Sequence, residues 1–139
     1  MVLFTMGLEG PDGSPHYTQD DVRELARALT GWTVDPRTLV AEFDPARHDN
    51  GAKTLFGRTD QFDYASAIDW LFEARADAIA HYVCTRLYEA FVAAPANPAH
   101  VETLAAQFKT DWAIDPIVER LLRSEAFFDA GVIGAQVSD

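Results

Sequence analysis

The 139-residue sequence has one cysteine, few basic side chains and no long apolar run. The single thiol, Cys84, excludes an internal disulfide and any cluster of thiolate metal ligands. No apolar stretch reaches the roughly 20 residues that a membrane-spanning helix needs. Residues 1–6 have neither the basic start nor the length of a signal peptide. The sequence therefore predicts no membrane span and carries no targeting signal, and it leaves the compartment open.

The shortage of basic residues also bears on the choice of partner. Eleven Lys and Arg residues stand against 22 Asp and Glu residues, which gives a formal net charge of -11 at pH 7. Such a chain repels a phosphate backbone, so we expect no nucleic acid partner. Hydrophobic residues make up 48% of the sequence, enough for a folded core. We expect a single helical domain over residues 1–139.

Helical patterns account for most of the sequence. Thr18 and Asp21 have the spacing of a capping box, and Gly31 is suited to a left-handed stop after the first helix. Apolar stripes predict further helices after Asp60 to near Ala74, over about 76–93, from Asn97-Pro98 to Phe108, and from Asp115-Pro116 to Phe128. In the last two we expect Asn97 and Asp115 to cap the helix, each followed by a proline in the first turn. The stretch 76–93 is apolar on most sides, which predicts that this helix is the central one.

Two short runs between the first two helices have a different period. Residues 39–44 alternate between apolar and polar side chains, and residues 53–56 form a second run that ends at Gly57. We predict that these runs pair as one hairpin with a long loop. The predicted fold class is mainly α, with about five packed helices and one short β-hairpin between the first and second clear helices.

The loop from His48 to Lys53 holds the densest group of reactive side chains. In an acid–base site, Asp49 would orient the imidazole of His48, and the ammonium of Lys53 would stabilise a developing anion. The alternative is structural: Asp49 caps the turn at Asn50-Gly51, His48 ties the loop to the helices, and Lys53 pairs with an acid. The catalytic residues are thus unknown, with His48, Asp49 and Lys53 as candidates.

A pocket and a metal site are the other readings of this loop. Trp32 follows Gly31 outside the helix, where it can form a pocket wall together with Tyr17. A zinc or manganese site would draw on His48, Asp49, Asp44 and His16. Their spacing matches no known metal motif, so we predict no metal. Which cofactor the protein uses, if any, is unknown from the sequence.

The ordered motifs of the chain resemble those of a large bacterial family, domain of unknown function 1800. The matching segments are Leu3-Phe4-Thr5-Met6-Gly7, residues 17–32, Phe43 with His48-Asp49-x-Gly51-x-Lys53, Leu55-x-Gly57, Tyr82-Val83, Arg86-Leu87, Phe91-Val92 and Leu121-Leu122-x-Ser124-x-x-Phe127-Phe128. The resemblance covers nearly the whole chain. It implies a longer and often exported parent, of which this chain is a fragment covering the later part of the family domain.

The family resemblance implies no activity, so two functions are weighed. The first is a structural or protein-interaction module of a larger exported protein. The second is a fragment of an enzyme, metal-dependent in one version, with its site around His48, Asp49 and Lys53. We also expect a protein partner or self-association, because a missing preceding helix would leave Leu3, Phe4 and Met6 exposed.

Overall fold

The computed structural model describes residues 2–10 and 13–129. The chain divides into two compact units, one containing Leu8–Arg75 and the other containing Met1–Gly7 with Ala76–Asp139. We call them the N-terminal unit and the C-terminal unit, and we describe each by itself. The prediction of one domain over the whole chain stays a prediction.

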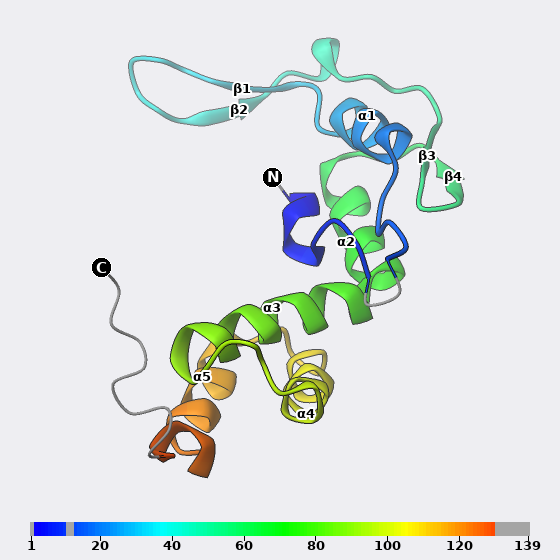
Figure 1. Cartoon of the computed structure of the whole chain (residues 1–139). Coiled ribbons are helices and arrows are strands. Elements are labelled where there is room, and N and C mark those ends of the chain that lie inside the picture. Colours follow the sequence, from blue (N-terminus) through cyan, green and yellow to red (C-terminus); the bar gives the residue numbers. More distant parts are fainter. Residues whose placement is uncertain (1, 11–12, 130–139) are drawn as a thin grey trace. The chain divides into compact units, whose positions relative to one another are not determined.

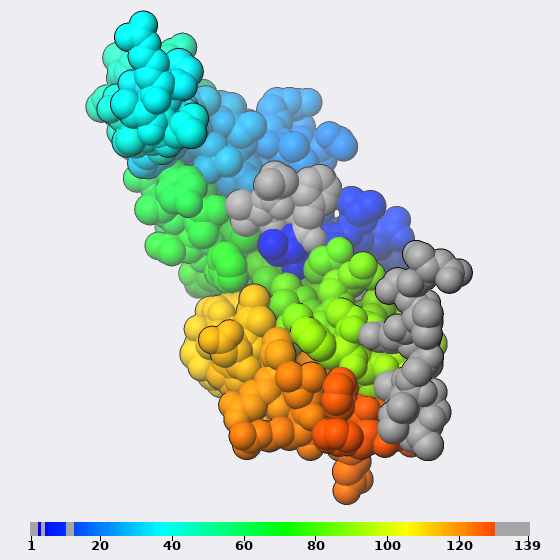
Figure 2. Space-filling view, turned by 90° about the vertical axis from the view of Figure 1, so that its left-hand side faces the viewer, coloured from blue at the N-terminus to red at the C-terminus, as the bar shows by residue number. Residues whose placement is uncertain are grey.

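The N-terminal unit combines helices with short antiparallel strand pairs (Figure 1). Its elements are α1 (Gln19–Ala28), β1 (Trp32–Val34), β2 (Ala41–Phe43), a 3-10 turn η2 (Pro45–Arg47), β3 (Lys53–Leu55), β4 (Arg58–Asp60) and α2 (Tyr64–Ala74). The β1–β2 hairpin extends away from α1, and its cyan tip protrudes in Figure 2. The buried side chains of this unit come from α1, β3, the segment before α2, and α2 itself: Asp21, Leu25, Ala28, Lys53, Leu55, Phe62, Ala67 and Leu71.

Helix α1 begins as the sequence predicts. The Thr18 side chain accepts a hydrogen bond from the Asp21 backbone N–H, and the Asp21 carboxylate accepts one from the Thr18 backbone N–H. This capping box satisfies two N–H groups that the first turn leaves without helical partners. The helix ends at Ala28, and Gly31 follows with φ at +94°. The predicted left-handed position of Gly31 is confirmed.

The predicted pairing of residues 39–44 with residues 53–56 is wrong. Each run forms its own hairpin: β2 pairs with β1, and β3 pairs with β4. The first pairing was missed because Trp32–Val34 directly follows the helix and is too short to show alternation. The second was missed because β4 reads Arg-Thr-Asp, with no apolar residue. Both strand pairs lie between the first two helices, where the sequence places the β structure.

The C-terminal unit is helical, with α3 (Ala76–Phe91), α4 (Pro98–Phe108), α5 (Ile114–Leu122) and the 3-10 turns η1 (Val2–Met6) and η3 (Glu125–Phe128). Helix α3 lies against both α4 and α5 (Figure 1), so it is the central helix of this unit. The core consists of Ala80, Cys84, Tyr88, Val92, Val101, Leu104, Ala105, Phe108, Ile117 and Leu121. Burial raises the pKa of the Cys84 thiol to about 11, so this cysteine is an inert apolar side chain.

Two helix starts in this unit were predicted from an Asn or Asp residue followed by proline, and only the first is confirmed. Asn97 caps α4 as predicted, with its side chain accepting from the N–H groups of Ala99 and His100. The predicted cap at Asp115 is wrong, because α5 begins at Ile114 after Ala113 and no side chain caps it. Pro116 still lies in the first turn, where a missing N–H costs no helical hydrogen bond. The last helix ends at Leu122, so Phe128 lies in η3 and not in the helical stripe.

The expected exposure of the N-terminal residues is also wrong. Leu3 and Met6 are 6% and 0% exposed, and η1 packs on α3 within the C-terminal unit. The side chain of Phe4 lies outside the described residues. The premise for self-association through these residues therefore fails.

The fold class is confirmed as mainly α, with five α-helices among the described residues and a β-hairpin region between the first two. Within the described ranges, no helix has the length and apolar character needed to cross a bilayer.

Candidate functional site

The His48 loop is attached to α1 by a ladder of side-chain contacts. Asp21, Glu24 and Arg27 lie one turn apart on the same face of α1. The Asp21 carboxylate accepts from Phe56 N–H at 2.9 Å, and the Glu24 carboxylate accepts from Thr54 N–H at 3.1 Å. The Arg27 guanidinium donates a hydrogen bond to the Ala52 carbonyl oxygen, with a distance of 3.3 Å. Three helix side chains thus satisfy alternate backbone groups along the outer edge of β3.

Asp49 is engaged by this same helix. Its two carboxylate oxygens accept from Arg27 Nε at 2.8 Å and from a terminal guanidinium nitrogen at 3.3 Å. One oxygen also accepts from Gly51 N–H at 2.9 Å, which caps the turn. The hydrogen bonds from Arg27 and from Gly51 N–H lower the pKa of Asp49 to about 2. Asp49 is therefore a permanently charged anchor of the loop at neutral pH.

Lys53 is the most unusual residue of the loop, because its side chain is only 1% exposed. Its ammonium donates to the carbonyl oxygens of Asp49 at 2.5 Å, Gly51 at 3.0 Å and Phe62 at 2.8 Å. All three N–H donors of the ammonium are thus used by backbone acceptors. Lys53 holds the loop to the segment before α2, and its ammonium has no N–H donor left for a substrate.

His48 is fixed to the end of α1. Its Nδ1 lies 2.9 Å from the Thr30 carbonyl oxygen. A carbonyl only accepts, so Nδ1 carries the proton in the neutral ring and Nε2 is left as an acceptor. Thr30 supports the same junction: its hydroxyl donates to the Arg27 carbonyl at 2.7 Å and accepts from Asp49 N–H at 2.8 Å. His48 and Asp49 therefore make separate contacts to the helix end and do not form a hydrogen-bonded pair with each other.

A polar hollow lies beside the imidazole. It is lined by Phe43, Pro45, His48, Asn50, Lys53, Gln61 and Asp63. Of the three catalytic candidates, His48 and Lys53 line it and Asp49 does not. The Asp63 carboxylate caps α2 by accepting from Ser66 N–H and Ser66 Oγ, and these bonds lower the pKa of Asp63. The hollow therefore holds the Nε2 of His48, an available acceptor, together with the Asp63 carboxylate, which already caps α2.

The predicted pocket residues lie outside this lining. Trp32 lies on β1, is 48% exposed and packs its ring against Phe43, with centroids 5.4 Å apart. Phe43 in turn contacts the His48 ring at 5.6 Å. Trp32 therefore borders the hollow through Phe43, whereas half-buried Tyr17 is not in its lining.

The residues predicted as metal ligands each make a separate structural contact. Asp44 caps η2 by accepting from Ala46 N–H, Asp49 binds Arg27, and the His16 carbonyl accepts from Arg75. Among the described residues, no three His, Cys, Asp or Glu side chains come together as a metal site.

Arg27 is a residue of this site to which the sequence analysis gives no role. The side chain is half-buried between Glu24 and Asp49, and its pKa is raised by the hydrogen bonds to Asp49 and then to Glu24. Its partner lies 22 residues away, and no local pattern reveals such a contact. The spacing of Asp21, Glu24 and Arg27 on one face is the signal that was available.

An exposed apolar surface adjoins the hollow. In the β1–β2 register Trp32 lies opposite Phe43 and Val34 opposite Ala41, so these side chains share one face of the hairpin. Tyr64, at the start of α2, packs its ring edge-on against Trp32 at 5.9 Å. The exposed fractions are 48% for Trp32, 60% for Val34, 44% for Phe43 and 51% for Tyr64. We call these four residues the aromatic face.

Comparison with known proteins gives one family. Residues 1–138 match the family described as protein of unknown function, DUF1800. No curated protein matches the chain, and no solved structure does.

Proposed function

Because the chain belongs to the DUF1800 family, whose description assigns no function, we propose a function from its surface. The chain is a protein-interaction module, and its aromatic face binds an apolar, basic segment of a partner protein in extended conformation. The observation that carries the proposal is the aromatic face, which consists of three exposed apolar side chains on the protruding β1–β2 hairpin and Tyr64 packed against them. The resemblance to longer, exported proteins supports the further proposal that the module serves a larger exported protein.

The hairpin geometry supports an extended partner. Strands β1 and β2 pair only with each other within the described part of the chain. Each strand therefore keeps one outer edge whose backbone N–H and C=O groups are available to an added strand. An added strand would continue the apolar row of Trp32, Val34 and Phe43 with alternate side chains of its own. The aromatic face supplies specificity, and the edge supplies hydrogen bonds.

The charge of the chain supports a basic partner. The formal net charge is -11, and a cationic side chain gains further from the faces of exposed aromatic rings. A second copy of the chain is the less favoured occupant, because two such acidic surfaces repel each other.

The loop contacts support a non-catalytic role. The ammonium of Lys53 and the carboxylate of Asp49 are both used to hold the loop. An enzyme would have only His48 and Asp63 in the hollow, and the Asp63 carboxylate already caps α2. Acid–base sites bring together several groups from separate segments that are free to react.

The test uses the whole chain and a display library of linear peptides. We expect selection to enrich peptides in which apolar residues alternate with Lys or Arg. Trp32→Ala and Phe43→Ala should each weaken binding of an enriched peptide about tenfold or more, because aromatic anchors dominate such interfaces. Phe128→Ala, which truncates an aromatic side chain that is 64% exposed elsewhere in the chain, is the matched control.

Two results would count against the proposal. One is the absence of enriched peptides, and the other is an enriched peptide that binds the Trp32→Ala and Phe43→Ala variants as tightly as the natural chain. Light scattering across a wide concentration range tests whether a second copy of the chain occupies the aromatic face. A dimer that is lost in the Trp32→Ala variant would assign the aromatic face to a second copy.

A further inference from the structure

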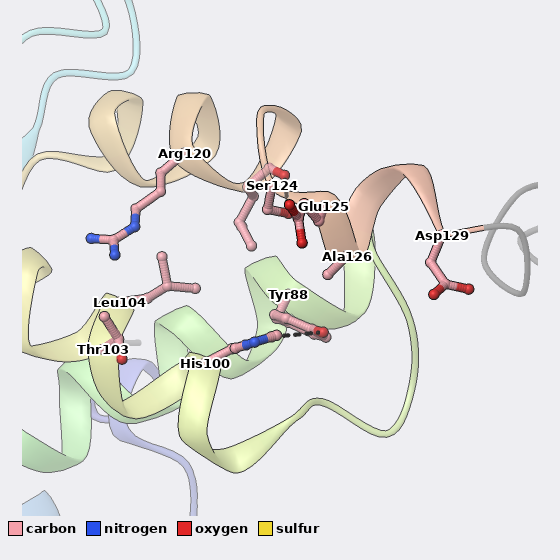
Figure 3. A pocket seen from close by; sticks show the side chains of 10 residues that line it. Tyr88, His100, Thr103, Leu104, Arg120, Ser124, Glu125, Ala126 and Asp129 are labelled. Atoms are coloured by element: carbon pink, nitrogen blue, oxygen red, sulfur yellow. Dashed lines mark hydrogen bonds between the residues drawn. The ribbon is translucent and has the colours of Figure 1, made fainter.

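The C-terminal unit has a separate hollow that the proposed function does not use. It lies between α3, α4, α5 and η3 and has a volume of about 570 Å³ (Figure 3). Ligand pockets for small molecules fall in the range of about 300–1,000 Å³. The hollow combines an apolar floor with charged side chains on its walls, so its size and its lining both suit a small polar ligand.

Arg120 supplies an unneutralised cation to this hollow. Its guanidinium donates to the side-chain oxygen of Gln107 at 2.8 Å, which is a neutral acceptor. No carboxylate pairs with Arg120 among the described residues. In Figure 3 the guanidinium reaches from α5 toward Thr103 and Leu104 of α4. A guanidinium with unused N–H donors in a hollow is suited to a carboxylate ligand.

Glu125 supplies the opposite charge at another part of the same lining. It lies in the first turn of η3, and Asp129 lies beyond it in Figure 3. Among the described residues, the Glu125 carboxylate has no hydrogen bond or ion pair. Glu125 and Arg120 come from the same wall but do not pair with each other. The hollow therefore presents a free cation and a free anion at separate places.

Another part of the same lining is apolar. Leu104, Leu121 and Ala126 form this part, and the first two are only 4% and 2% exposed. The Tyr88 hydroxyl lies 3.3 Å from His100 Nδ1, which fixes the imidazole and leaves Nε2 for a ligand. The buried leucines give an aliphatic group a surface on which to pack.

We propose that this hollow binds a small zwitterion of the amino acid class that carries an aliphatic side chain. Arg120 receives the carboxylate, Glu125 receives the ammonium, and the floor of Leu104 and Leu121 receives the side chain. Each charged group of the ligand thus meets an opposite charge that has no ionic partner among residues 2–10 and 13–129. The site lies in the C-terminal unit and does not rest on the proposed role of the aromatic face.

The test is a titration of the whole chain with L-leucine, in which calorimetry measures the affinity and amide chemical shifts locate the binding site. Leucinamide lacks the carboxylate and 4-methylpentanoate lacks the ammonium, so we expect each to bind about tenfold or more weakly than leucine. Arg120→Gln should remove the preference for leucine over leucinamide, and Glu125→Gln should remove the preference over 4-methylpentanoate.

Neighbouring residues provide matched controls. Arg123→Gln and Glu119→Gln make the same chemical changes in a surface ion pair at the C-terminal end of α5, outside the hollow, and they should leave binding unchanged. The chemical shift changes should map to Tyr88, His100 and Leu104. No binding at about 10 mM leucine, equal binding of the three compounds, or binding that Arg120→Gln leaves intact would each overturn the proposal.

Discussion

Lys53 is a charged side chain in an almost fully buried position, and it is compensated by carbonyl oxygens, with no carboxylate among its hydrogen-bond acceptors. Replacing it with methionine keeps the volume and apolar stem but removes all three N–H donors. The carbonyls of Asp49, Gly51 and Phe62 would then be left without this partner. At the residue scale, Lys53 is therefore the position where a conservative change in shape has the largest expected cost.

We predict that Lys53→Met lowers the free energy of unfolding by about 3 kcal/mol or more, because several acceptors lose their donor in a buried position. Urea unfolding is followed by tryptophan fluorescence in a Trp112→Phe background, so that Trp32 and Trp70 report on the N-terminal unit. Arg23→Met is the control in the same unit, since it breaks an exposed pair with Asp20 and should cost less than about 1 kcal/mol. Equal effects of the two substitutions would contradict the role of Lys53.

Asp49 should give the N-terminal unit a defined acid sensitivity. Its folded pKa is about 2, below the ordinary value of 3.8. The folded state therefore binds its proton less readily than the unfolded state, so the contribution of Asp49 is complete above pH 3.8 and is lost as the pH falls toward 2. We expect Asp49→Asn and Arg27→Gln to lower the urea midpoint of unfolding above pH 4. Near pH 2 the midpoints of the variants and of the natural chain should converge. A constant difference over this range would exclude the contribution of the ion pair.

Some features of the His48 loop could be predicted from the sequence and others could not. His48, Asp49 and Lys53 could be selected from residue type and spacing alone, and the structural alternative for Asp49, a cap on the turn at Gly51, matches its contacts. The partners could not be predicted, because Arg27 and the Phe62 carbonyl are distant in sequence. Helix starts were predictable at Thr18 and Asn97, where the signal is local capping chemistry.

At the element scale, the orientation of the β1–β2 hairpin depends on the short connection at Gly31. A Cβ atom added there would lie 2.7 Å from the Phe43 ring, 3.0 Å from the Asp44 carbonyl oxygen and 3.2 Å from His48 Cβ. The left-handed φ of +94° adds backbone strain for any other residue. Gly31 thus lets α1, β2 and the His48 loop meet at one point, and this junction supports the aromatic face.

Gly57 provides a matched comparison for this junction. It has a similar φ of +84°, but an added Cβ meets nothing within 4 Å. We predict that Gly57→Ala costs about 1 kcal/mol from backbone strain alone, whereas Gly31→Ala costs about 2 kcal/mol more because the ring and the carbonyl must move. Urea unfolding in the Trp112→Phe background measures both. Similar losses for the two variants would mean that the close contacts at Gly31 relax without cost.

At the scale of the whole molecule, the net charge of -11 and the aromatic face should act on different steps of binding. The charge acts over distance and draws a basic segment toward the chain, and salt screens it over about 10 Å at 0.1 M. The apolar side chains act only after contact, when they are removed from water. Charge therefore governs the association rate, and the aromatic face governs the dissociation rate.

We predict that raising NaCl from about 0.05 to about 0.5 M slows association of a selected basic peptide about tenfold and changes its dissociation little. Trp32→Ala should show the reverse, with faster dissociation and a nearly unchanged association rate, because it removes buried contact area and no charge. Surface plasmon resonance on the whole chain separates the two rates. A peptide whose association ignores salt would show that the acidic composition does not select the partner, and a slower association in Trp32→Ala would show that the aromatic face acts before contact.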